Sequence, residues 1–77
     1  MKSNIENSKE EKIFSYKVIM CPCCGSKTLD NFYICRFCRW EYDGIRDKNR
    51  YSSCNSSSIL NYRKTNNIKF NFLRFFF

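Results

Sequence analysis

The cysteines are the residues of this chain whose type and spacing are best suited to chemistry. Five of the six lie in two short motifs, CPCCG at residues 21–25 and CRFC at residues 35–38. Each motif holds a C-x2-C pair, which lets two sulfur atoms reach one ion from a single tight turn. The ten residues between the pairs are enough for a short hairpin that sets one pair opposite the other. The spacing therefore predicts a closed tetrahedral site for one Zn²⁺ per chain, with the ligands Cys21, Cys24, Cys35 and Cys38.

Two cysteines fall outside this ligand set. Cys23 lies inside the first motif, where a regular turn would point it away from the ion. We expect a small packed side chain there, with a reserve or redox-sensitive thiol as the alternative. Cys54 lies in a serine-rich, loop-like segment, and no chemical role is expected for it.

Disulfide bonds are the main alternative to metal binding. Six cysteines allow three bridges, but the adjacent Cys23 and Cys24 suit such a framework poorly. No basic start followed by an apolar stretch marks a secretory leader, so we expect a cytoplasmic protein whose thiols stay reduced. A redox-active thiol pair is a further alternative.

The absence of histidine argues against an enzyme. Imidazole-based triads and proton relays are excluded, and catalytic zinc usually needs at least one histidine and an open position. The acidic residues near the second motif are expected to neutralise arginines at the surface rather than to act as an acid and a base. The acidic residues are Glu41, Asp43 and Asp47, and the arginines are Arg36, Arg39 and Arg46. We therefore expect no catalytic residues.

The net charge and the aromatic residues indicate which kind of partner the protein could bind. Fourteen Lys and Arg residues against seven Asp and Glu residues give a formal net charge of +7, which favours an anionic partner. Trp40 is expected to cover the metal site as a hydrophobic lid. Alternatively, Trp40, Phe37 and Tyr42 form a base-stacking platform, with Arg36 and Arg39 contacting phosphates. No apolar run is long enough to span a membrane.

The elements that position the cysteines must be short, because 77 residues make a single small domain. We expect a polar tail over residues 1–12 and a cysteine-rich domain over residues 13–77. Patterning predicts a strand at 13–20, a strand, turn and strand at 28–34, a short strand at 39–42, a loop at 43–58 and a helix at 59–69. Ser56, Ser57 or Ser58 is expected to cap this helix. The fold class is a small metal-stabilised α+β domain, with zinc-ribbon-like or rubredoxin-knuckle-like β-hairpins followed by one C-terminal helix.

The last eight residues, FNFLRFFF, are strongly apolar and aromatic. A free segment of this composition would promote aggregation. We therefore expect it to pack on the domain or on a partner.

CPCCG, the Tyr33-Ile34-Cys35 run and the Trp40-Glu41-Tyr42-Asp43 run together resemble the cysteine-rich CPCC family of small bacterial proteins. The resemblance implies zinc binding through the paired cysteines and no assigned biochemical role. Leu29 and Asn55 also match the family pattern. Arg36 replaces its usual proline and Asn71 stands where glycine is usual, which predicts a looser, more basic second loop and a turn at Asn71.

The sequence thus predicts a small zinc-binding protein with a structural site, acting as a protein-interaction module. Two alternatives remain open: a basic zinc-ribbon protein that binds nucleic acid, and a rubredoxin-like iron redox protein.

Overall fold

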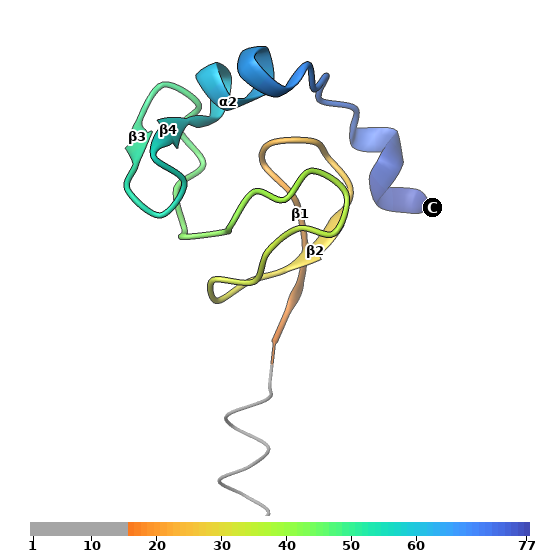
Figure 1. Cartoon of the computed structure of the whole chain (residues 1–77). Helices are drawn as coiled ribbons and strands as arrows, with labels where there is room; N and C mark the ends of the chain where they lie inside the picture. Colours follow the sequence, from red (N-terminus) through yellow and green to blue (C-terminus); the bar gives the residue numbers. More distant parts are fainter. Residues whose placement is uncertain (1–15) are drawn as a thin grey trace, which may run out of the picture.

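The computed structural model describes residues 16–77. The predicted tail, its boundary at residue 12 and the first part of the predicted strand at 13–20 lie outside this range. Figure 1 shows two small hairpins, a helix and a short terminal helix arranged around the loops that carry the cysteines. The elements are β1 (Val18–Met20), β2 (Lys27–Leu29), β3 (Tyr51–Ser52), β4 (Ser57–Ser58), α2 (Ile59–Asn66) and the 3₁₀ helix η1 (Phe72–Phe76).

The first hairpin carries the first cysteine motif in its connection. Strands β1 and β2 pair antiparallel, with Val18 opposite Leu29 and Met20 opposite Lys27. After β2 the chain turns through Asn31 and Phe32, both at positive φ, and returns alongside itself. The predicted strands at 33–34 and 39–42 are reduced to one bridge between Ile34 and Glu41. They are short because the second cysteine loop occupies the residues between them.

The second hairpin leads directly into the helix. Strands β3 and β4 pair antiparallel, with Ser52 opposite Ser57. Ser58 caps α2, since its side chain accepts a hydrogen bond from the backbone N–H of Asn61 at 3.1 Å. The helix ends at Asn66, before the predicted residue 69, because Asn67 adopts a left-handed conformation at φ 56. The N–H of Ile68 then closes back on the carbonyl of Arg63 at 2.8 Å, which terminates the helix.

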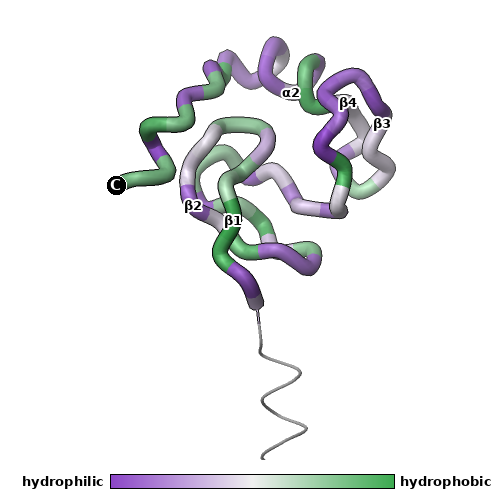
Figure 2. Tube along the Cα trace, turned by 180° about the vertical axis from the view of Figure 1, so that it is seen from behind, coloured by the Kyte–Doolittle hydropathy of each residue, from purple (hydrophilic) through white to green (hydrophobic). Residues whose placement is uncertain are grey.

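The core consists mainly of the cysteines. Its fully or almost fully buried apolar residues are Cys21, Cys23, Cys24, Cys35, Cys38, Trp40 and Ile59. Trp40 meets the ring of Tyr62 edge to face, with centroids 5.1 Å apart, and so joins α2 to the cysteine loops. Figure 2 shows hydrophobic residues along these loops and again along the C-terminal segment. A core of this size supplies little stability without a further constraint.

The C-terminal segment packs on the first cysteine loop through its backbone and Arg74. The N–H of Asn71 donates to the carbonyl of Cys24 at 3.0 Å, and Arg74 Nη1 donates to the same carbonyl at 2.8 Å. Asn71 has an extended backbone at φ −145 and caps η1 by accepting a hydrogen bond from the N–H of Leu73, so it begins a 3₁₀ helix and does not adopt the left-handed conformation that glycine would favour in a turn. Phe72 and Phe76 remain exposed, by 55% and 68%. The expected packing on the domain therefore holds for the backbone and not for these rings.

None of the helices within residues 16–77 has the length and apolarity that a bilayer crossing requires.

The close approach of Asn71 to Gly25 predicts that alanine substitutions at the two glycines of the chain lower the stability by different amounts. Both have positive φ, +91 for Gly25 and +90 for Gly44, so alanine at either position costs about 1–2 kcal/mol of backbone strain. A Cβ on Gly25 would also lie 2.3 Å from the carbonyl oxygen of Asn71, whereas nothing lies within 4 Å at Gly44. We expect Gly25→Ala to lower the free energy of unfolding by about 1–3 kcal/mol more than Gly44→Ala.

Urea denaturation of the metal-loaded protein measures this difference, with Gly44→Ala as the matched control. Equal losses of unfolding free energy in the two variants would mean that the C-terminal segment does not pack closely against the first cysteine loop.

Candidate metal centre

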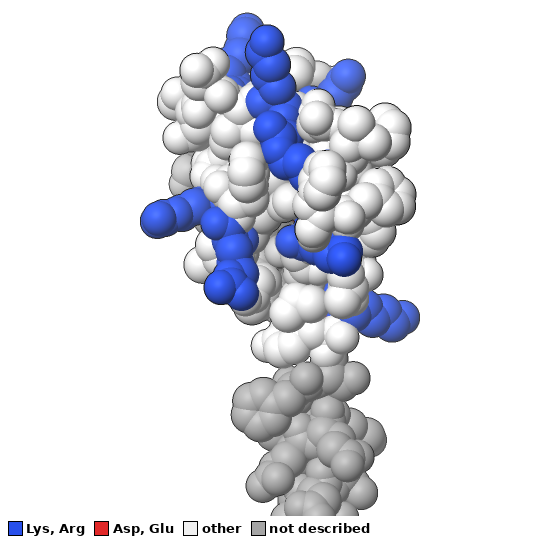
Figure 3. Space-filling view, turned by 90° about the vertical axis from the view of Figure 1, so that its right-hand side faces the viewer, with Lys and Arg blue, Asp and Glu red and all other residues white. Residues whose placement is uncertain are grey.

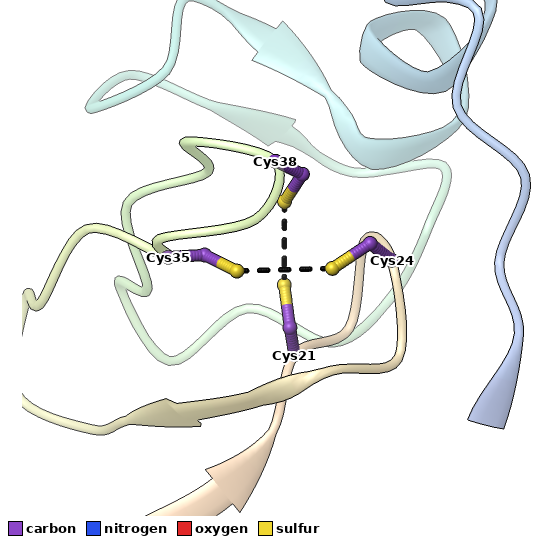
Figure 4. Close-up of side chains that lie close together, drawn as sticks. All are labelled: Cys21, Cys24, Cys35 and Cys38. Atoms are coloured by element: carbon purple, nitrogen blue, oxygen red, sulfur yellow. Dashed lines mark hydrogen bonds between the residues drawn. The ribbon is translucent and has the colours of Figure 1, made fainter. Parts of the chain in front are cut away.

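The structure brings the four predicted ligands together in a buried cluster. The sulfur atoms of Cys21, Cys24, Cys35 and Cys38 all lie within 4.8 Å of one another (Figure 4). Two of the pairs are Cys21 with Cys38 at 3.6 Å and Cys24 with Cys35 at 3.7 Å. Four sulfurs around one zinc ion, with bonds of about 2.3 Å, would be about 3.8 Å apart. The cluster therefore has the size that a four-sulfur metal site requires.

Two loops of the same construction position these sulfurs. In the first, the N–H of Cys21 donates to the carbonyl of Ser26 and the N–H of Gly25 donates to the carbonyl of Cys21. In the second, the N–H of Cys35 donates to the carbonyl of Trp40 at 2.9 Å, and the N–H of Arg39 donates to the carbonyl of Cys35 at 2.8 Å.

Arg39 takes the position that corresponds to Gly25 and has φ 71, a conformation that is costly for a side chain of this size. The second loop is thus more basic, as predicted. It is nevertheless closed by the same two hydrogen bonds as the first.

The crowding of the thiols shifts their protonation. Interaction with Cys21 lowers the pKa of Cys24 to about 6 and also lowers the pKa of Cys35. The same interactions raise the pKa of Cys21, mainly through Cys24, and that of Cys38, mainly through Cys21. Without a cation the cluster therefore holds protons on some sulfurs so that others can ionise. A divalent ion would replace those protons and neutralise the thiolates.

Ser26 is a contact of the cluster that sequence reasoning missed. Its hydroxyl oxygen lies 3.1 Å from the sulfur of Cys24 and 3.4 Å from that of Cys35. A hydroxyl in this position can donate a hydrogen bond to a thiolate and help to fix its orientation. Its place directly after the first motif was the available signal.

Two arginines from the C-terminal half hold the first loop, and neither was predicted. Arg63 donates through Nε to the carbonyl of Cys23 at 2.9 Å and through Nη2 to that of Pro22 at 2.8 Å. Arg74 takes the next carbonyl, that of Cys24. Three consecutive carbonyls of the cysteine loop thus accept from two cations. The sequence separations of about 40 and 50 residues give no local signal for these contacts.

The exposure of the aromatic side chains around the second loop distinguishes the two roles predicted for them, a hydrophobic lid and a base-stacking platform. Trp40 is 1% exposed, as a lid would be, so it is not available for the base-stacking platform considered from the sequence. The hydroxyl of Tyr62 donates to the carbonyl of Cys38 at 2.8 Å and ties the helix to this loop. Phe37, by contrast, is 58% exposed.

The remaining cysteines differ in environment. Cys23 is fully buried, in agreement with the packed side chain expected, although interaction with Cys38 lowers the pKa of its thiol. Cys23 thus packs in the same buried core as the four ligands but is not one of the sulfurs gathered within 4.8 Å. Cys54 is exposed, and partial desolvation together with the carboxylates of Glu41 and Asp43 raises the pKa of its thiol.

The acidic side chains stabilise turns and the backbone. Asp43 accepts hydrogen bonds from the hydroxyl of Ser52 at 2.6 Å and from the N–H of Ile45 at 3.1 Å. Both of its oxygens are therefore engaged by groups other than the arginines that were predicted to pair with it. Asn55 bonds both the N–H and the carbonyl of Glu41, at 2.8 and 2.9 Å, as a neighbouring strand would. This explains structurally why an asparagine in the loop accompanies the Trp-Glu-Tyr-Asp run.

The arginine contacts predict that Arg63 cannot be replaced by lysine without loss. A lysine keeps the charge but cannot donate in the fixed fork that reaches two carbonyls. We expect Arg63→Lys to lower the free energy of unfolding of the metal-loaded protein by about 1–3 kcal/mol. Arg50→Lys, the same change at an exposed site, should stay within about 0.5 kcal/mol in the same urea titration. Similar small effects in both variants would show that the fork does not hold the loop.

The comparisons with known proteins agree with this construction. The family model described as Cysteine-rich CPCC matches residues 19–72, which include both cysteine loops, α2 and the start of η1. No significant match was found among curated proteins or among solved structures. Because the family model covers well over half of the 77 residues, the chain belongs to the cysteine-rich CPCC family.

Proposed function

We propose that this is a small zinc-binding protein whose single ion is held by Cys21, Cys24, Cys35 and Cys38. The observation that carries the proposal is the buried cluster of four sulfurs at separations suited to tetrahedral coordination. An all-sulfur donor set favours zinc or iron over magnesium or calcium, which prefer oxygen ligands. The two hydrogen-bonded loops support a zinc-ribbon-like description of the fold.

The role proposed for this ion is structural. Four protein ligands would complete its coordination and leave no position for water or substrate, unlike a catalytic zinc site. The ligands are also the larger part of the buried core, so binding the ion and forming the core are one event. We therefore propose that the protein is not an enzyme. The thiolate form of the cluster suits a reducing compartment, which supports a cytoplasmic location.

The domain is proposed to act through a binding surface, as an interaction module. The support is the C-terminal segment, which is anchored by its backbone while it presents Phe72, Leu73 and Phe76 to solvent. Exposed apolar groups gathered in this way mark interaction sites on small domains.

Metal analysis tests the site. Protein purified without added metal should contain about one zinc per chain and negligible iron, because four thiolates hold one ion. Chelation should abolish the folded circular dichroism signal, since the core includes the ligands. Cys24→Ser and Cys38→Ser should lose the metal.

Cys23→Ala and Cys54→Ser serve as controls for the loss of a thiol and should retain the zinc. A red, redox-active preparation containing iron would favour the rubredoxin-like alternative. Metal-free protein with no reactive thiols would favour disulfides and contradict the site itself.

A further inference from the structure

The C-terminal segment and the two cysteine loops form one continuous surface, which we call the basic aromatic face. We define it by Lys27, Arg36, Phe37, Lys69, Arg74 and Phe76. Arg74 lies over the ring of Phe37 at 4.5 Å and donates a hydrogen bond to the carbonyl of Lys69, and Lys27 lies 6.0 Å from the ring of Phe75, which packs on Phe76. Arg36 directly precedes Phe37 in the second cysteine loop. Figure 3 views the side of the molecule on which the C-terminal segment lies in Figure 1.

Charge on this face has one sign. Figure 3 shows several lysine and arginine side chains and no acidic side chain among the described residues visible there. Two of the acidic residues, Asp30 and Asp43, instead line a separate hollow with Phe32 and Tyr42. The face in Figure 3 thus presents basic and no visible acidic side chains among the described residues, and its complement is an anionic ligand.

The cations alternate with aromatic rings. Arg63 lies 5.2 Å from the ring of Phe70, which continues the pattern set by Arg74 with Phe37 and Lys27 with Phe75. Arg63 and Arg74 donate hydrogen bonds to backbone carbonyls, which fixes their guanidinium groups. The fixed groups in turn hold the rings of Phe70 and Phe37 in position. Lys27, Arg36 and Lys69 are exposed, so their charged ends are placed to meet an anion in solution.

We propose that the basic aromatic face binds single-stranded nucleic acid. The exposed rings of Phe37 and Phe76 offer planar surfaces on which unpaired bases stack, while Lys27, Arg36 and Lys69 contact phosphates. Such binding tolerates any base, because every base has a flat face. The inference rests on the proposed function, since the zinc site would fix the loop whose Cys24 carbonyl anchors the C-terminal segment.

An acidic protein partner would match the charge of the face equally well. It would not, however, use the exposed rings of Phe37 and Phe76 next to exposed cations, an arrangement that suits the unpaired bases and phosphates of a single strand. Duplexes hide their bases in the stack, so the face should prefer single strands.

Fluorescence anisotropy with a labelled oligothymidylate of about 15 nucleotides tests the proposal on the full-length, zinc-loaded protein. We expect binding that weakens steeply between about 50 and 200 mM salt. At about 0.1 M salt, where distant charges are screened, the double variant Lys27→Glu/Lys69→Glu should lose about tenfold or more in affinity. Phe76→Ser should lose about fivefold through the missing stack.

Matched controls place the same changes elsewhere. Lys48→Glu/Arg50→Glu alters the charge equally in the exposed loop before β3, and Phe32→Ser removes a similarly exposed ring at the tip of the first hairpin region. Both controls should stay within about threefold of the parent protein.

Three results would overturn the proposal: no binding at low salt, equal losses in test and control variants, or polyglutamate competing as well as the oligonucleotide. The last result would indicate an acidic protein as the partner. Zinc content and circular dichroism are measured on every sample, so a failure of the zinc site is distinguished from a failure of this face to bind.

Discussion

The gathering of four cysteine sulfurs within 4.8 Å is the constraint on which the rest of the structure depends. Four thiolates at that separation repel one another unless a cation or shared protons offset their charge. The opposite shifts of the thiol pKa values, downward at Cys24 and Cys35 and upward at Cys21 and Cys38, express this conflict. Because these sulfurs are also most of the core, whatever neutralises them also holds the domain together.

The other elements can be understood as supports for this cluster. Each cysteine loop closes with its own pair of backbone hydrogen bonds, so each presents its two sulfurs without help from a large sheet. The C-terminal half then contacts both loops: Tyr62 bonds the second, whereas Arg63 and Arg74 bond the first. These long-range bonds explain how residues 16–77, whose sheets are all two-stranded, order a helix and a 3₁₀ segment around one small centre.

The sequence was informative where a local rule decides the structure. The C-x2-C spacing identified the four clustered sulfurs, and the serines at 56–58 with the apolar positions after them predicted the capped start of the helix, which is Ser58. The predicted strands around the second cysteine loop were too long, because strand propensity does not indicate how few residues this loop leaves for pairing. Arg63 and Arg74 could not be found, because their carbonyl partners are distant in sequence and any basic residue on a surface carries the same local pattern.

The central claim is that one zinc ion completes the cluster. X-ray absorption at the zinc edge of protein purified without added metal tests it most directly. The account predicts a single shell of four sulfurs at about 2.3 Å. A shell that includes nitrogen or oxygen ligands would contradict it, as would a protein whose four clustered cysteines are paired in disulfides.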